Sequence, residues 1–303
     1  MAIPPPKNKP ERPPWAKPAP VLKGRAESTP DGDRIAKLLA RAGIASRREV
    51  ERMIAEGRIK LNDAAVTTPA TILKSLAGIT VDGKPVAAPA PPLLFRFHKP
   101  EGLLTAERDP AGRPTIYDAL KNALPKGTPR LMPIGRLDLN TEGLLLLTND
   151  GALKRAMELP ASGVPRTYRA RTFGDISQAT LEGLAEGVTI EGMRYGSIDA
   201  NMERKTGRNQ WIELTLSEGK NREVRRILGS LALEVNRLIR ISYGPFQLMD
   251  LTPGMVEPVK RRVLADQLGP EAEAFGLTGA IDGYKARQSK LRPGSRQPDD
   301  EED

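Results

Sequence analysis

An aspartate in a polar loop between two apolar segments is the residue of this sequence best placed to do chemistry. Asp138 lies between Leu137 and Leu139, after the apolar residues 131–134 and before a run of four leucines at 144–147. The pattern predicts a strand, a polar loop and a buried strand. A carboxylate flanked by apolar side chains loses hydration, which costs free energy unless a partner compensates. Asp138 could therefore be a nucleophile or base on the floor of a cleft, or a loop aspartate that only caps its own turn.

The composition excludes several kinds of chemistry. The 303 residues include no cysteine and one histidine, His98, which argues against thiol catalysis, disulfides, zinc sites of cysteine or several histidines, and paired-histidine ribonuclease chemistry. The net charge of +9 favours a polyanionic partner, nucleic acid first and an anionic membrane surface second. No apolar run approaches the roughly 20 residues that span a bilayer, and the first residues lack the apolar core of a signal peptide. We therefore expect a cytoplasmic protein, not embedded in a membrane, that uses carboxylate or hydroxyl chemistry.

The loop and its flanks resemble a known active-site motif. Residues 135–148 read G-R-L-D-L-N-T-E-G-L-L-L-L-T, which resembles the motif of the RsuA-like pseudouridine synthases. The resemblance continues in order over roughly residues 34–260, which gives it far more weight than one short motif. Its further motifs are FHKPEG at 97–102, RTYR at 166–169, EGKNREVRR at 218–226 and NRLIR at 236–240. Two segments, DPAGRPT at 109–115 and GRNQW at 207–211, are most similar to the RluB branch, which acts on large-subunit ribosomal RNA.

The resemblance implies the isomerisation of uridine to pseudouridine in ribosomal RNA. This reaction adds and removes no atoms, so no cofactor and no metal are expected, and the sequence has no glycine motif for a nucleotide cofactor. Asp138 would be the catalytic carboxylate, and Arg225 would pair with it and keep it ionised. Tyr168 would offer its ring to the uracil and its hydroxyl for proton transfer, unless it is only a packed strand tyrosine. Whether Asp138 would attack C1′, attack the base or remove a ribose proton stays open.

Two further side chains complete the expected substrate pocket. Leu238 would close the side opposite Tyr168, although an ordinary core leucine fits the same pattern. Arg136 could fill the space left by a uridine that leaves its stack, or contact its phosphate. His98 stands at a strand end before Lys99-Pro100, where a structural role is expected.

Two short helices with a basic face are predicted near the N-terminus. Apolar residues recur at helical spacing over 35–42 and 50–54, and Ser46 with Glu49 forms a capping box for the second helix. With the small strands that follow, this order of elements resembles the S4 RNA-binding domain. Six cations opposite the apolar stripes, without balancing acids on that face, are expected to contact phosphates: Arg34, Lys37, Arg41, Arg47, Arg48 and Arg52. A merely solvated face is the alternative for these helices. We expect Lys220 and Arg222 to contact RNA as well.

The chain divides into five parts by composition. We expect a disordered, basic, proline-rich arm at 1–33, an S4 domain at 34–83, a linker at 84–92, a catalytic domain at 93–262, and an extension at 263–303 that is disordered from about 283. The catalytic domain should hold strands at 93–97, 166–172, 211–216, 239–242 and 247–251, and helices at 116–124, 152–159, 180–186 and 222–231. Because these do not alternate as βαβ units, we expect an α+β domain on a mixed, mainly antiparallel sheet with a central cleft.

Two other functions fit parts of the pattern. An S4-bearing ribosome-assembly factor without catalysis would keep the basic helices but lose Asp138, Tyr168 or Arg225, and all three are present. An S4-linked methyltransferase would need a glycine-rich cofactor loop after a strand, which the sequence lacks. A monomer is the expected state, and the sequence does not name the uridine.

Overall fold

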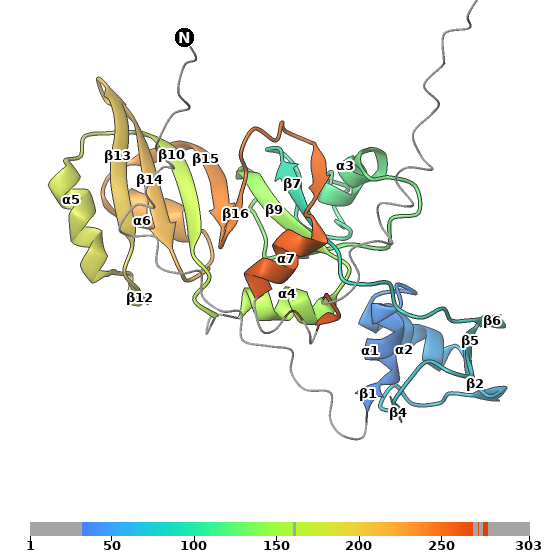
Figure 1. Cartoon of the computed structure of the whole chain (residues 1–303). Coiled ribbons are helices and arrows are strands. Elements are labelled where there is room, and N and C mark those ends of the chain that lie inside the picture. The colour runs from blue at the N-terminus through green and yellow to red at the C-terminus, as the bar shows by residue number, and fades with distance from the viewer. Residues whose placement is uncertain (1–31, 160–161, 269–271, 273–274, 278–303) are drawn as a thin grey trace, which may run out of the picture.

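The computed structural model describes residues 32–159, 162–268, 272 and 275–277. Residues 1–31 of the arm predicted at 1–33, and the segment predicted to be disordered from about 283, lie outside these residues. Asp33, predicted to belong to the arm, lies in the first strand. The described chain forms a small N-terminal unit and a larger unit built on one sheet (Figure 1). No helix in the described part is long and apolar enough to cross a membrane.

The N-terminal unit packs two helices against short strands. Its elements are β1 (Asp33–Arg34), α1 (Ile35–Arg41), α2 (Arg47–Ala55), β2 (Ile59–Leu61), β3 (Ala64–Ala65), β4 (Ile72–Leu73), β5 (Ile79–Val81) and β6 (Lys84–Pro85). The buried residues Ile35, Leu39 and Val50 bring the apolar faces of both helices into one core. Ser46 caps α2 by accepting a hydrogen bond from the Glu49 amide at 3.2 Å. The Glu49 carboxylate pairs with Arg52, so the expected capping box is only half formed.

The N-terminal unit extends beyond its predicted end at residue 83. Strand β6 pairs with β5, with Thr80 opposite Pro85, so the first two residues of the expected linker belong to the sheet. Proline is compatible with this position because β6 is an edge strand.

The larger unit is a mixed sheet that is antiparallel except at one pair. The strands are β7 (Leu94–Lys99), β8 (Met132–Ile134), β9 (Glu142–Thr148), β10 (Arg166–Phe173), β13 (Asp199–Thr206), β14 (Asn209–Leu216), β15 (Glu234–Tyr243), β16 (Phe246–Gln247) and β17 (Val256–Pro258). Their order is β13-β14-β10-β15-β9-β7-β17, with β8 beside β9 and β16 beside β15. The exception is the parallel pair of β9 and β15. The predicted α+β class with a mixed, mainly antiparallel sheet is confirmed.

Helices cover both faces of this sheet. They are α3 (Ile116–Ala123), α4 (Gly151–Glu158), α5 (Gln178–Glu182), α6 (Glu223–Ser230) and α7 (Arg261–Leu268), with a 3₁₀ turn at Gly183–Glu186 and a small hairpin of β11 (Val188–Ile190) and β12 (Met193–Tyr195). Leu144 and Leu146 of β9 point into a core with α4 and α7, whereas Leu145 and Leu147 point into a core with α3. A strand buried on both faces explains why four consecutive leucines occur there.

Two predictions for the C-terminal part were wrong. Helix α7 crosses the expected boundary at residue 262, because Leu264 and Leu268 are spaced to bury one helix face in the core of the sheet. The predicted strand at 247–251 is paired only at its start, in β16. Met249 has φ +53°, a left-handed conformation that turns the chain out of the sheet.

Candidate active site

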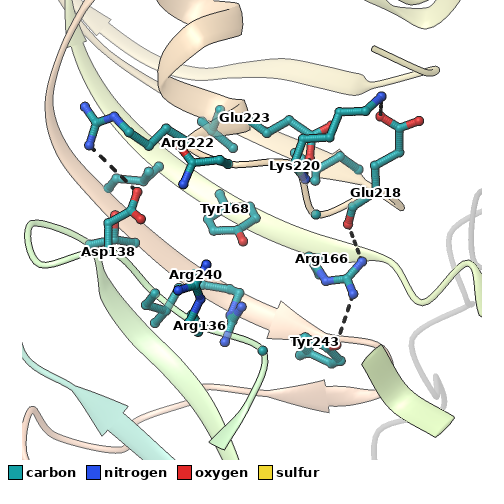
Figure 2. A pocket seen from close by; sticks show the side chains of 18 of the residues that line it. Arg136, Asp138, Arg166, Tyr168, Glu218, Lys220, Arg222, Glu223, Arg240 and Tyr243 are labelled. Atoms are coloured by element: carbon teal, nitrogen blue, oxygen red, sulfur yellow. Dashed lines mark hydrogen bonds and ion pairs between the residues drawn. The ribbon is translucent and has the colours of Figure 1, made fainter. Parts of the chain in front are cut away.

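A cavity of about 620 Å³ opens beside β10 and β15, next to the loop between β8 and β9 (Figure 2). This volume is in the range of pockets that hold small organic ligands. It is lined by the loop 135–141, by the two strands, and by the segment 218–224 that leads into α6. The side chains expected in the substrate pocket all reach it: Arg136, Asp138, Tyr168 and Leu238. Arg225 does not line the cavity, whereas Lys220 and Arg222 do.

The loop that carries Asp138 is fixed through its backbone. Thr105 binds both the amide and the carbonyl of Leu137, at 3.2 and 2.8 Å. The Asp138 carbonyl accepts a hydrogen bond from the Thr141 amide at 3.1 Å, and the Leu139 carbonyl accepts one from Gly102 at 2.9 Å. Satisfied carbonyls on successive residues hold a polar loop in one conformation next to a packed core.

The carboxylate of Asp138 is not used to build this turn. Among the described residues, no backbone amide donates to it; its contact is an ion pair in which Arg222 Nη1 lies 3.8 Å from Asp138 Oδ2. The side chain is 39% exposed and faces the cavity. The geometry therefore disfavours the interpretation of Asp138 as a turn cap and leaves its carboxylate available to a ligand.

Arg225 contacts the Asp138 loop in a different way from the one expected. Its Nη2 donates to the Asn140 carbonyl at 2.7 Å, and its Nη1 donates to the Val235 carbonyl at 2.8 Å. The expected direct ion pair with Asp138 was wrong, since Arg222 occupies that place in the described structure. Burial, with the nearby charge of Arg222, lowers the pKa of Arg225, and the charge of Asp138 opposes this shift. Arg225 thus ties α6 and β15 to the loop from outside the cavity.

Lys99 is a second cation beneath this loop. Its side chain is fully buried, and Nζ donates to the carbonyls of Thr141 at 2.8 Å and Pro100 at 3.0 Å, with Leu139 more distant at 3.4 Å. Burial lowers the pKa of Lys99 to about 8, and the charge of Asp138 acts in the opposite direction. The sequence motif included Lys99, but a buried role could not be read from its residue type.

Tyr168 and Leu238 approach the cavity from neighbouring strands. On β10 and β15, Ala170 stands opposite Leu238 and Tyr168 stands opposite Arg240. Leu238 is 5% exposed, and Tyr168 is half-buried. Both can therefore present apolar surface to a flat ligand.

The parallel contact of β9 with β15 depends on a glycine of the motif. Gly143 has φ +106°, and a Cβ there would stand 2.3 Å from the Arg240 carbonyl oxygen. Only glycine allows the strands to approach so closely. The approach brings the end of the Asp138 loop next to β15.

Two acids lie at the start of α6: Glu218 precedes the helix, and Glu223 is its first residue. Glu218 pairs with Lys220 at 2.6 Å, and Glu223 accepts a hydrogen bond from the Lys220 amide at 3.0 Å. Burial raises the pKa of Glu223 to about 7, and the charge of Glu218 acts in the same direction. Arg222 begins α6 in a left-handed conformation with φ +50° and lies on the Asp138 side of the cavity in Figure 2.

The cations of the N-terminal unit have unequal surroundings. Three are exposed without an acidic partner among the described residues: Arg34, Arg47 and Arg48. Lys37 pairs with Asp33, and Arg52 pairs with Glu49. The expectation of a basic face without balancing acids was therefore wrong, because acids one helical turn away lie next to two of the six cations.

Arg41 contacts the larger unit. Its Nε lies 3.4 Å from Asp150 Oδ2, and the Asp150 side chain is only 4% exposed. The other carboxylate oxygen of Asp150 caps α4 by accepting from the amides of Ala152 and Leu153 at 2.7 and 3.0 Å. The ion pair joins the first helix of the N-terminal unit to a helix beside the cavity.

Among the described residues, no three His, Asp or Glu side chains gather in a way that could hold a metal ion.

Two family models match the chain. The model of RNA pseudouridylate synthases matches residues 94–230, and the S4 domain model matches residues 33–75.

The chain is similar to bacterial proteins over most of its length. An RNA pseudouridine synthase of Rickettsia felis is 40% identical over 231 residues, which cover 76% of this chain and 98% of that protein. The ribosomal large subunit pseudouridine synthase B of Pasteurella multocida is 40% identical over 229 residues, or 74% of this chain and 65% of that protein. A crystal structure of a pseudouridylate synthase has a similar fold, with a TM-score of 0.52 and 24% identity over 78% of this chain and 99% of the other.

Proposed function

The chain belongs to the family of RNA pseudouridine synthases, and we propose that it isomerises uridine in ribosomal RNA of the large subunit, with Asp138 as the catalytic carboxylate. The family membership supports the reaction type. The name of the relative in Pasteurella multocida supports the choice of RNA. With ribosomal RNA as its substrate, the enzyme would work in the cytoplasm.

One observation carries the assignment of Asp138. Its loop is fixed by backbone contacts at 137–141, while its carboxylate faces the cavity and takes no part in those contacts. A preorganised loop with an available carboxylate is what nucleophilic or acid–base catalysis needs, because positioning supplies much of the rate. The Arg222 guanidinium, 3.8 Å away, places a positive charge beside this carboxylate at the cavity.

The neighbouring residues support a substrate of one flipped nucleotide. Tyr168 and Leu238 offer two surfaces between which a uracil ring can lie. Arg136 is exposed at the cavity, where it can contact the phosphate or fill the gap left in the RNA stack. Arg225 and Lys99 act on the loop and not on the ligand.

The N-terminal unit is proposed to position the RNA. Arg34, Arg47 and Arg48 are exposed and suit phosphate contacts, which orient a protein on RNA without reading its sequence. Lys220 and Arg222 would continue this basic surface at the cavity itself.

The experiment is pseudouridine mapping on large-subunit ribosomal RNA treated with the purified protein and no added cofactor. The product has the mass of uridine, because the C1′–N1 bond is replaced by a C1′–C5 bond while the C5 hydrogen is lost and N1 gains one. We expect a pseudouridine at one or a few positions. RNA that is bound but unchanged would instead indicate an assembly factor.

A further inference from the structure

Arg240 is a buried arginine with most of its hydrogen-bonding capacity unused. Its side chain is 2% exposed and makes one hydrogen bond within the described residues, from Nε to the Leu144 carbonyl at 2.8 Å. Nη2 is buried without a partner, and neither terminal nitrogen has a hydrogen bond or an acid within 4 Å among the described residues. A buried cation without a counter-charge is costly unless something else compensates for it.

Arg166 shows what a purely structural arginine in the same cavity wall does. Its Nη1 donates to the carbonyls of Val164 and Ser217, both at 3.0 Å, and its Nη2 donates to the Tyr243 hydroxyl at 3.0 Å. Both guanidinium groups lie on the ring of Tyr243, with Arg166 4.8 Å and Arg240 5.1 Å from its centroid. Arg166 therefore donates its hydrogen bonds within the protein, whereas neither terminal nitrogen of Arg240 has a hydrogen-bond partner among the described residues.

The position of Arg240 places it where it would contact the uracil base and not the phosphates of the RNA backbone. It follows Leu238 by two residues on β15, so the two side chains share one strand face, and it stands directly opposite Tyr168 on β10. On its other side it is in register with Gly143, at the end of the Asp138 loop. Figure 2 shows Arg240 among the labelled side chains that line the cavity, between Asp138 and Tyr243 in this view. A ring held between Tyr168 and Leu238 would turn its edge towards Arg240.

The edge of uracil carries two carbonyl oxygens, O2 and O4, which are acceptors for a guanidinium. They are also the atoms on which charge develops. When the C1′–N1 bond breaks, its electron pair stays with the base, and the negative charge is shared by N1, O2 and O4. Removal of a ribose proton followed by loss of the base produces the same anion. Addition of a carboxylate to the base at C6 places the charge on O4 through C5.

We propose that Arg240 is a catalytic residue of this enzyme, whose terminal nitrogens donate to a uracil carbonyl oxygen and stabilise the negative charge of the base during C1′–N1 cleavage. The inference rests on the proposed function, since it needs a uridine in this cavity. It is the same for each route by which Asp138 could act, because every route moves charge onto the base. A fixed donor aimed at developing charge in a site shielded from water accelerates reactions strongly, by about 10²–10³-fold per donor in other enzymes.

The test combines changes in the protein with changes in the substrate. Arg240→Gln and Arg240→Lys would be compared with wild type in single-turnover reactions at saturating RNA. The target position would carry uridine, 2-thiouridine or 4-thiouridine, because sulfur is a much weaker acceptor than oxygen. Arg169→Gln is the matched control: this strand arginine neighbours β15 on β10, forms an exposed ion pair with Glu203 and lines no part of the cavity.

We expect Arg240→Gln to lower the rate on uridine by about 10²-fold or more with little change in RNA affinity. The loss should shrink to less than about 10-fold on one thio substrate, which identifies the oxygen contacted. Equal losses on all three substrates, or a loss confined to affinity, would overturn the proposal. Thermal melting checks folding, and Arg240→Lys provides the same comparison if the glutamine variant is unfolded. Wild-type turnover on uridine tests the proposed function separately.

Discussion

Arginines serve two different purposes in the two regions of this molecule. In the N-terminal unit they are exposed, and several pair with carboxylates, as Arg52 does with Glu49. At the cavity Arg136 and Arg222 are exposed as well. Arg166 in the cavity wall and Arg225 behind the Asp138 loop are instead partly or fully buried and donate to backbone carbonyls. The difference teaches that charge alone does not reveal a role. An exposed guanidinium attracts a polyanion. A buried guanidinium holds backbone carbonyls in place, and its positive charge acts on the groups around it.

The energetic consequences differ accordingly. Exposed ion pairs contribute about 0–1 kcal/mol each to folding and weaken as salt is added. Loss of a buried donor leaves carbonyls unsatisfied, at about 1–3 kcal/mol per group. Changes in the N-terminal unit should therefore affect RNA affinity and little else, and changes around the cavity should affect rate and stability.

The largest effect is expected for Asp138→Asn. Asparagine keeps the shape of the side chain but can act neither as a nucleophile nor as a base, so pseudouridine formation should fall by about 10³-fold or more. Binding of RNA and the free energy of unfolding should stay close to wild type, because the carboxylate is not used in the loop. Single-turnover assays and filter binding measure the two quantities. An Asp138→Asn variant that keeps a tenth of the wild-type rate would contradict the assignment of Asp138 as the catalytic carboxylate.

Arg225→Met should have the next largest effect. Methionine fills a similar volume but cannot donate to the carbonyls of Asn140 and Val235, so the loop loses an anchor. A displacement of about 1 Å at the loop is enough to lower the rate about 10²-fold. We expect this loss together with about 1–3 kcal/mol of destabilisation.

Urea unfolding and single-turnover rates would be measured on the same Arg225→Met preparation. Arg222→Met is the comparison, because it removes the 3.8 Å ion pair with Asp138 but no carbonyl contact. A lower rate without destabilisation in Arg225→Met, and no effect in Arg222→Met, would restore the direct ion pair that the sequence resemblance implied.

The sequence was sufficient for four of the residues that line the cavity, Arg136, Asp138, Tyr168 and Leu238, and for the order of most elements. Asp138 and Tyr168 were found because a long resemblance names positions in a motif. The partners of these residues were not found, because a motif gives residue types and not contacts. Arg222 and Arg225 are three positions apart, and it is Arg222, with its left-handed backbone conformation, whose guanidinium lies 3.8 Å from the Asp138 carboxylate.

Other features depend on distant parts of the chain. Arg240 alternates with apolar residues along β15, a pattern typical of a half-exposed strand. Its burial comes from the close approach of β9 at Gly143, which the sequence pattern does not show. Strand β13 was missed because it is an edge strand with mostly exposed side chains. The apolar spacing of α7 was present in the sequence, but the polar tail after it favoured an extension outside the core.

A buried acid offers a pH test of the cavity side. The pKa of Glu223 is raised by burial to about 7 from an ordinary 4.5, so the native state holds a proton that the unfolded state releases between these values. Wild-type stability should therefore fall as pH rises through this window. Glu223→Gln removes the titration while keeping an acceptor for the Lys220 amide. The gain of Glu223→Gln in free energy of unfolding over wild type should be absent near pH 4 and should reach on the order of 3 kcal/mol at most above pH 7.

Urea unfolding at pH 4.5 and pH 8 measures this difference. Asp82→Asn is the control from the N-terminal unit: Asp82 is an exposed acid in a turn with φ +50°, which asparagine tolerates, and its ion pair with Arg58 lowers its pKa. Asp82→Asn should show no gain above pH 7. Higher stability of Asp82→Asn than wild type at pH 8, or no higher stability of Glu223→Gln, would contradict the claim that only the buried acid destabilises the protein as pH rises.

The smallest effect on rate is expected for the exposed cations of α2. Replacing both Arg47 and Arg48 by alanine should weaken RNA binding. The slope of log affinity against log salt concentration should also become shallower, by about 0.7 for each phosphate that the variant no longer neutralises. This value is the one for single-stranded nucleic acid. Arg41→Ala should change that slope less, since Arg41 is engaged by Asp150 at 3.4 Å. Affinities at several salt concentrations give these values.

The division of labour between the two regions is tested most directly by one rate. The Arg47→Ala, Arg48→Ala double variant is saturated with large-subunit ribosomal RNA, and its single-turnover rate of pseudouridine formation is compared with wild type. Equal rates at saturation, with a weaker affinity, are the predicted result, because the exposed arginines position RNA and take no part in the chemistry. A rate reduced more than about 10-fold at saturation, or about 1.4 kcal/mol in the barrier, would show that the N-terminal unit completes the active site and would contradict the account.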